Sequence, residues 1–145
     1  MISAQRWRDN WRSLTSGDAV HFELPRAKGA RQASLAEARE LPAGTPVVFS
    51  SPAPVAAGRC RAFASAAGIE VEREYLAFPT AAAPAYLVED LPAPVRLFIA
   101  NALVVPPRSR FSLVMEIGVT VLRGLRSWRL VRTLAPGRVV VGRRK

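Results

Sequence analysis

Few side chains in this sequence could carry out chemistry by themselves. His21 is the only histidine, and Glu23 shares its face of a predicted strand, as a general base and a carboxylate partner would. The favoured interpretation is nevertheless a structural histidine. Cys60, the only cysteine, lies in an alanine-rich helical stretch, where a buried thiol behaves as a small hydrophobic group. Neither residue predicts a catalytic centre, and none is assigned.

Ser50 and Ser51 end the apolar run PVVFSS, and ligands of parallel α/β sheets bind outside the carboxyl ends of the strands. These serines, with Tyr86 in a later loop, form a possible pocket. A simpler interpretation is that the serines cap the turn that follows. Glu89 and Asp90 are an acidic pair without a second acidic cluster, so they predict a solvated turn and no metal site.

Arginines at every third position form a basic pattern near the carboxyl end. The predicted site for an anionic partner consists of Arg123, Arg126, Arg129, Arg132 and Trp128. Because three residues advance a helix by about 300°, these arginines spiral around it instead of forming one stripe. One interpretation is a solvated face with packed side-chain stems. The other is binding of anionic lipid or an acidic protein, with RNA less favoured because aromatic stacking residues are scarce nearby.

The net charge of the chain is concentrated at one end. The 145 residues have a formal charge of +10. Residues 1–105 carry eleven Lys/Arg against ten Asp/Glu, whereas residues 106–145 carry ten against the single Glu116. A field of this kind favours an anionic partner. No run is long and apolar enough to predict a signal peptide or a membrane-spanning helix, so we expect a cytoplasmic location, with a peripheral position at the membrane as the alternative.

Apolar periodicity and Pro/Gly positions predict alternating helices and strands. Ser34 and Glu37 suggest a capping box, and Gly68 sits where a left-handed helix cap belongs. The segment IEVEREYLAF predicts a strand with Glu70, Glu72 and Glu74 on one acidic face. The expected helices cover residues 3–14, 34–41, 55–67, 95–105 and 109–134, and the expected strands cover 19–25, 46–51, 69–78 and 138–142.

This alternation predicts an α/β layer structure with a small, mostly parallel sheet in which residues 46–51 form a central strand. A single domain of residues 1–145 is expected. It comprises an N-terminal docking helix (1–18), an α/β core (19–80), a helical basic insertion (81–135) and a final strand (136–145).

The run LPAGTPVVFSS, the later AAGIEVEREY and the closing RVVVGRRK resemble the C-terminal half of a class I, Rossmann-like S-adenosylmethionine-dependent methyltransferase. The resemblance covers residues 33–80 and 136–145, and it implies a fifth, a sixth and an antiparallel seventh strand of an incomplete Rossmann-like sheet. Members of the family bind the cofactor through a Gly-rich turn after the first strand. No G-x-G occurs in this sequence, so no cofactor-binding residue carries over.

Together these features lead us to expect a non-catalytic or partner-dependent methyltransferase-like protein. Its basic C-terminal region would dock a larger complex or an anionic membrane surface. A protein partner or a homo-oligomer is expected, with no metal, and S-adenosylmethionine only if a partner completes the site. The alternatives are a methyltransferase completed by a partner chain and a basic nucleic-acid-binding module.

Overall fold

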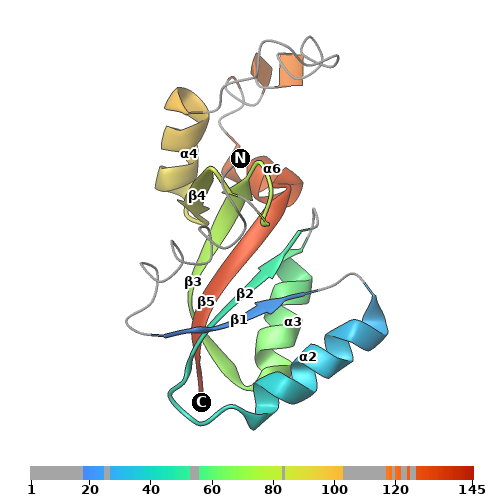
Figure 1. The fold of residues 1–145 in the computed structure, drawn as a ribbon. Coiled ribbons are helices and arrows are strands. Elements are labelled where there is room, and N and C mark those ends of the chain that lie inside the picture. Colours follow the sequence, from blue (N-terminus) through green and yellow to red (C-terminus); the bar gives the residue numbers. More distant parts are fainter. Residues whose placement is uncertain are drawn as a thin grey trace.

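Five strands form one mixed sheet in which the last strand of the chain lies in the middle, in the order β1-β2-β5-β3-β4 (Figure 1). The structure is a computed structural model that describes residues 18–24, 27–52, 56–82, 84–102, 117–118, 120–121, 124 and 127–145. The strands are β1 (Val20–Glu23), β2 (Pro46–Ser51), β3 (Ile69–Phe78), β4 (Tyr86–Glu89) and β5 (Gly137–Arg144). The helices with complete bounds are α2 (Lys28–Glu40), α3 (Ala57–Ala67), α4 (Pro92–Asn101) and α6 (Trp128–Leu134).

The prediction of a mixed α/β fold is confirmed, but the prediction of a mostly parallel sheet is wrong. Only β1 and β2 pair in parallel, whereas β2–β5, β3–β5 and β3–β4 are antiparallel. The reason is that β5 returns between β2 and β3, and β4 turns back along β3 through a short connection. The run PVVFSS does form an interior strand, β2, but β5 occupies the centre.

Local signals placed the ends of α2 and α3 better than the start of α2, whereas the helix predicted over 95–105 is α4, Pro92–Asn101. Gly68 caps α3 with a positive φ of 64°, as predicted, because glycine adopts the left-handed region without steric cost. α2 ends at Glu40, just before Pro42, also as expected. The predicted capping box is wrong, because α2 begins at Lys28 and Ser34 lies inside the helix, where its hydroxyl donates to the Ala30 carbonyl at 3.3 Å.

Residues 81–135 were expected to be helical, but they contain the strand β4, and α4 and α6 are separate helices. α4 begins at Pro92, since proline suits the first turn of a helix. Ser127 then interrupts the predicted helix over 109–134, because it has an extended conformation and caps α6 by accepting a hydrogen bond from the Leu130 amide. The predicted helix over residues 3–14 lies outside the described residues.

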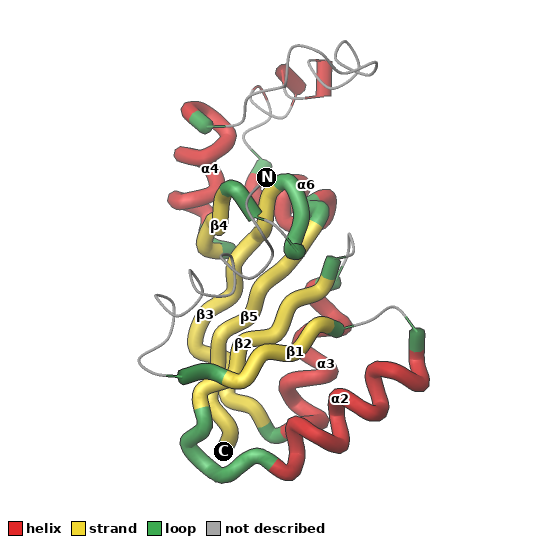
Figure 2. The backbone as a smooth tube through the Cα atoms, in the orientation of Figure 1, coloured by secondary structure: helices red, strands yellow, loops and turns green. Residues whose placement is uncertain are grey.

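All four of these helices pack on one face of the sheet. On β5, Arg138 and Val140 point to that face, and Val139 points to the other. Val140 belongs to a buried cluster with α2 and α3, the α2/α3 cluster. Leu76, which lies opposite Arg138, belongs to a second buried cluster with α4 and α6, the α4/α6 cluster. Figure 2 shows the two helix pairs at opposite ends of the sheet.

The other face of the sheet carries a third buried cluster, which consists of Val48, Tyr75, Ala77, Ala81, Val139 and Val141. Among the described residues, no helix has the length and apolar character that a bilayer crossing requires.

Candidate functional site

Five charged side chains meet on the helical face, between the α2/α3 cluster and the α4/α6 cluster. Arg138 Nη1 donates to Glu74 Oε2 at 2.8 Å and to Asp90 Oδ2 at 2.6 Å. Arg132 Nε donates to Asp90 Oδ2 at 2.8 Å, and Arg61 Nε donates to Glu74 Oε1 at 3.1 Å. We call these five residues the ion cluster. Their contacts connect β3, β5, α3, α6 and the residue after β4.

Strand alternation places Arg138 at the centre of the cluster. Its side chain is 3% exposed and shares its face of β5 with Val140. Its neighbours across the sheet are Ser51 on β2 and Leu76 on β3. A buried guanidinium is costly unless it is paired and hydrogen-bonded, which explains why two carboxylates converge on it.

A β-bulge brings Glu74 to the helical face. Val71 pairs with Gly142, but the next residue of β3 with a partner is Arg73, so Glu72 is the additional residue. An additional residue reverses the alternation of side chains beyond it. Glu74 therefore points toward Arg138, and the prediction that Glu74 shares an acidic face with the preceding glutamates is wrong.

Asp90 is fixed by its backbone and by α6. Its amide donates to the Glu74 carbonyl at 2.8 Å, which continues the β3–β4 pairing beyond Glu89. Its Oδ1 accepts a hydrogen bond from Trp128 Nε1 at 3.1 Å. Trp128 and Arg132 are four residues apart on α6 and so share a face of the helix, and the Arg132 guanidinium lies 5.3 Å from the Trp128 ring centre.

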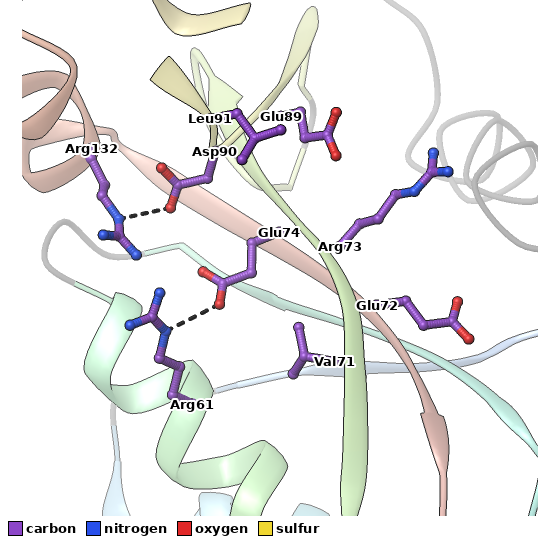
Figure 3. Close-up of a pocket in the computed structure, with 9 residues that line it drawn as sticks. All are labelled: Arg61, Val71, Glu72, Arg73, Glu74, Glu89, Asp90, Leu91 and Arg132. Atoms are coloured by element: carbon purple, nitrogen blue, oxygen red, sulfur yellow. Dashed lines mark hydrogen bonds and ion pairs between the residues drawn. The ribbon is translucent and has the colours of Figure 1, made fainter. Parts of the chain in front are cut away.

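A pocket of about 260 Å³ opens over the ion cluster (Figure 3). Arg61 enters it from α3 and Arg132 from α6, and each is bonded to a carboxylate of the cluster, Arg61 to Glu74 and Arg132 to Asp90. The remaining lining comes from β3, from the end of β4 and from the residue before α4. It consists of Val71, Glu72, Arg73, Glu89 and Leu91.

Hydrogen bonding divides the cluster into saturated acceptors and spare donors. All four carboxylate oxygens of Glu74 and Asp90 accept hydrogen bonds from Arg or Trp side chains. Arg61 and Arg132 each use only Nε for their side-chain bonds within the described part of the chain. With three arginines and two carboxylates, the cluster has a net charge of +1. The arrangement is therefore suited to accepting an anion, whereas proton abstraction by either carboxylate would first require an ion pair to break.

The structure does not bring the possible pocket residues Ser50, Ser51 and Tyr86 together. The two serines point to opposite faces of β2, and Tyr86 lies on β4, with β5 and β3 between. Tyr86 is half exposed and packs on Phe98 with ring centres 5.4 Å apart. Ser51 is fully buried opposite Arg138, and its hydroxyl has no hydrogen-bond partner in the described structure. It therefore does not cap the following turn.

Three of the five residues predicted to bind an anionic partner lie within the described residues. Arg129 is exposed on α6, whereas Arg132 and Trp128 both turn inward to Asp90. Arg123 and Arg126 lie outside the described residues. Arg132 thus has an internal partner, which the sequence pattern did not indicate.

The other candidate residues have ordinary surroundings. His21 and Glu23 are exposed on the edge strand β1. Cys60 is buried in the α2/α3 cluster, as expected of a core thiol. Burial raises the pKa of this thiol to about 11, and the nearby Arg138 charge only partly opposes that effect. The thiolate needed for nucleophilic chemistry is therefore scarce near neutral pH.

Sequence reasoning misjudged Asp90 and overlooked Arg138 and Glu74. The predicted solvated turn is wrong for Asp90, whose side chain is 2% exposed. One signal was available, because Arg138 immediately precedes three valines at the start of a predicted strand, and a charge buried with them would require a partner. No sequence signal identified which carboxylates would reach it.

Among the described residues, no three His, Cys, Asp or Glu side chains are grouped in a way that could hold a metal ion. Comparison of the chain with protein-family models, curated proteins and solved structures finds no match.

Proposed function

We propose that this chain is a methyltransferase-like α/β protein that works without a catalytic centre of its own and docks on an anionic membrane surface. The docking region comprises α4, α6 and the neighbouring described residues between 86 and 134.

Exposed apolar side chains in this region carry the proposal. The large exposed hydrophobic residues of the described structure all fall between positions 86 and 134. They are Tyr86, Leu91, Leu97, Ile117, Val121, Leu130 and Leu134. Soluble surfaces expose single apolar residues routinely, but their concentration in one segment marks an interaction site.

Exposed cations accompany these side chains. Arg96 precedes Leu97 on α4, and Arg129 precedes Leu130 on α6; all four side chains are exposed. α4 and α6 contact each other at the same end of the sheet (Figure 1). An apolar surface with neighbouring cations can insert leucines among acyl chains while the arginines remain at the anionic headgroups.

The direction of the strands supports the methyltransferase-like part of the proposal. β2 and β3 both run antiparallel to β5, so they run parallel to each other, and β5 is the last strand of the chain. The resemblance of residues 33–80 and 136–145 to the C-terminal half of a class I methyltransferase implies a final antiparallel strand of this kind.

Vesicle flotation tests the docking. We expect the chain to float with vesicles of phosphatidylcholine and phosphatidylglycerol, to float poorly with phosphatidylcholine alone, and to be released by high salt. Replacing both Leu130 and Leu134 by serine should lower partitioning by about tenfold or more, because a fully buried leucine contributes about 1.5–3 kcal/mol.

Lys28→Gln is the control for charge, since Lys28 is an exposed cation on α2, and α2 lies at the opposite end of the sheet from α6. It should leave flotation unchanged. Equal flotation of the double serine variant and the unaltered protein would reject the docking region. Absence of any lipid-dependent shift would reject membrane docking and leave a protein partner as the occupant of this surface.

A second candidate function is a transferase whose cofactor site is completed by a partner chain. The buried, unpartnered hydroxyl of Ser51 at the carboxyl end of β2 favours it, because ligands of open α/β sheets bind at such ends. Calorimetric titration of the chain with S-adenosylmethionine tests a premise that the two candidates share. Submillimolar binding by the chain alone would contradict both, because neither provides a complete site within one chain.

A further inference from the structure

We propose that the pocket over the ion cluster is a binding site for a phosphate group, which is held between Arg61 and Arg132. The inference does not rest on membrane docking, because the Arg61 and Arg132 side chains are held by the internal carboxylates of Glu74 and Asp90.

The first observation is the orientation of the two guanidinium groups. Figure 3 shows Arg61 and Arg132 pointing toward one another from α3 and α6. Each is held by a charge-assisted hydrogen bond through Nε, at 3.1 Å to Glu74 and 2.8 Å to Asp90. These bonds fix the orientation of each planar guanidinium group and leave its terminal Nη groups directed toward the pocket. There the Nη groups can donate hydrogen bonds to an oxyanion.

The second observation is the charge around the two facing arginines, since the three charged residues of the outer lining point away from them. Two facing guanidinium groups repel each other, and Arg138 adds a third positive charge beneath them. Glu74 and Asp90 supply only two negative charges, and their oxygen atoms are already occupied. An anion between Arg61 and Arg132 would neutralise the remaining charge and accept hydrogen bonds from both forks.

The third observation is the gradient of exposure. The Arg61 and Arg132 side chains are 58% and 26% exposed, whereas those of Glu74 and Asp90 are 15% and 2% exposed. The donors thus lie at the mouth of the pocket and the carboxylates at its floor. An incoming anion meets the arginines before it approaches the carboxylates.

The size and the outer lining of the pocket indicate a small ligand group. Its volume of about 260 Å³ is below the roughly 300–1,000 Å³ of pockets that enclose drug-sized molecules. Figure 3 shows Glu72, Arg73 and Glu89 on the other side of β3, with their charged ends away from the facing pair. A phosphate with a small substituent fits these limits.

Calorimetric titration with inorganic phosphate at constant ionic strength tests the site. We expect saturable binding to the unaltered chain and a loss of about tenfold or more for Arg61→Gln, which removes one fork. Arg61 is the better position to change, since it is more exposed than Arg132 and Arg132 also stabilises buried Asp90.

Two further variants separate geometry from charge. Arg61→Lys keeps the charge but loses the fork, so it should bind phosphate more weakly than the unaltered chain and more tightly than Arg61→Gln. Arg129→Gln removes a cation from α6 outside the pocket and should stay within about twofold of the unaltered chain, because a distant exposed charge is screened. The same unfolding midpoint for all variants would show that the fold is retained.

Vesicles that contain phosphatidic acid identify the source of the phosphate group. If Arg61→Gln weakens both inorganic phosphate and vesicle binding, the pocket accepts a lipid headgroup. If Arg61→Gln weakens the binding of inorganic phosphate but not the binding of vesicles, the ligand is a soluble phosphate compound. No saturable phosphate binding, or equal losses for Arg61→Gln and Arg129→Gln, would overturn the proposal.

Discussion

The two ends of the sheet bury their apolar side chains to different extents. At the α2/α3 end, Phe49, Phe63 and Leu24 are buried against the sheet, and no described residue before position 86 is a large exposed hydrophobic. At the α4/α6 end, Val95 and Ile99 are equally buried, yet Leu97 on α4 and Leu130 and Leu134 on α6 are exposed. The large apolar side chains of the α2/α3 end are therefore buried within the chain, whereas the α4/α6 end leaves several large apolar side chains exposed to solvent.

The ion cluster lies where these two ends meet. Arg61 comes from α3 at the first end and Arg132 from α6 at the second, and Arg138 lies between them on β5. Three predictions test the difference between the ends and the role of the cluster that joins them.

Loss of Arg138 should have the largest effect. Arg138→Met leaves Glu74 and Asp90 buried without their common partner, which should lower the free energy of unfolding by about 3–5 kcal/mol. Arg143→Met on the same strand removes a pair with Glu72 in which both side chains are 46% exposed, and should cost about 1 kcal/mol or less. Urea unfolding of both variants measures the contrast. Equal losses in the free energy of unfolding for the two variants would mean that the ion cluster does not hold the two ends together.

A pair of leucines compares the ends directly. Leu24 is 1% exposed in the α2/α3 cluster, and Leu97 is 67% exposed on α4. Leu24→Ala should lower the free energy of unfolding by about 2–5 kcal/mol through lost burial and a cavity. Leu97→Ala should change it by about 0.5 kcal/mol or less. A large cost at Leu97, measured in the same urea series, would show that the apolar excess of α4 is buried within the chain.

The Cys60 thiol gives a smaller effect that depends on pH. Its pKa is about 11 in the folded chain against 9.0 ordinarily, because burial disfavours the thiolate. The folded state therefore keeps its proton where the unfolded state loses it, so this contribution is complete below pH 9 and is lost as the pH rises toward 11. At about 1.4 kcal/mol per pKa unit, the loss amounts to about 2–3 kcal/mol.

Cys60→Ala isolates this contribution, because every other ionisable group is common to both proteins and cancels in the difference. The difference in free energy of unfolding between the two proteins should be constant up to about pH 9 and then fall. A difference that stays constant to pH 11 would show that the thiolate is tolerated inside the α2/α3 cluster.

Local sequence signals determined much of the fold. The apolar run of β2, the alternation of β3, the glycine after α3 and the valines of β5 each predicted an element that the structure contains. β4 was not predicted, since its four residues follow a proline-rich connection and become a strand only by pairing with β3. At Ser34 the error concerned the start of the helix, because α2 begins at Lys28 and the residues that extend it beyond the apparent cap are mostly exposed.

The sequence alone determined the element types, the buried position of Cys60 and the concentration of charge near the carboxyl end. Only the tertiary structure decided that Arg132 and Arg138 have internal partners, because Glu74 and Asp90 are distant in sequence and a bulge turns Glu74 to their side. Local patterns report the environment of one element at a time, whereas a charge cluster depends on the register and direction of several elements. The facing arginines over the pocket therefore appear only once the sheet has brought α3 and α6 to the same face.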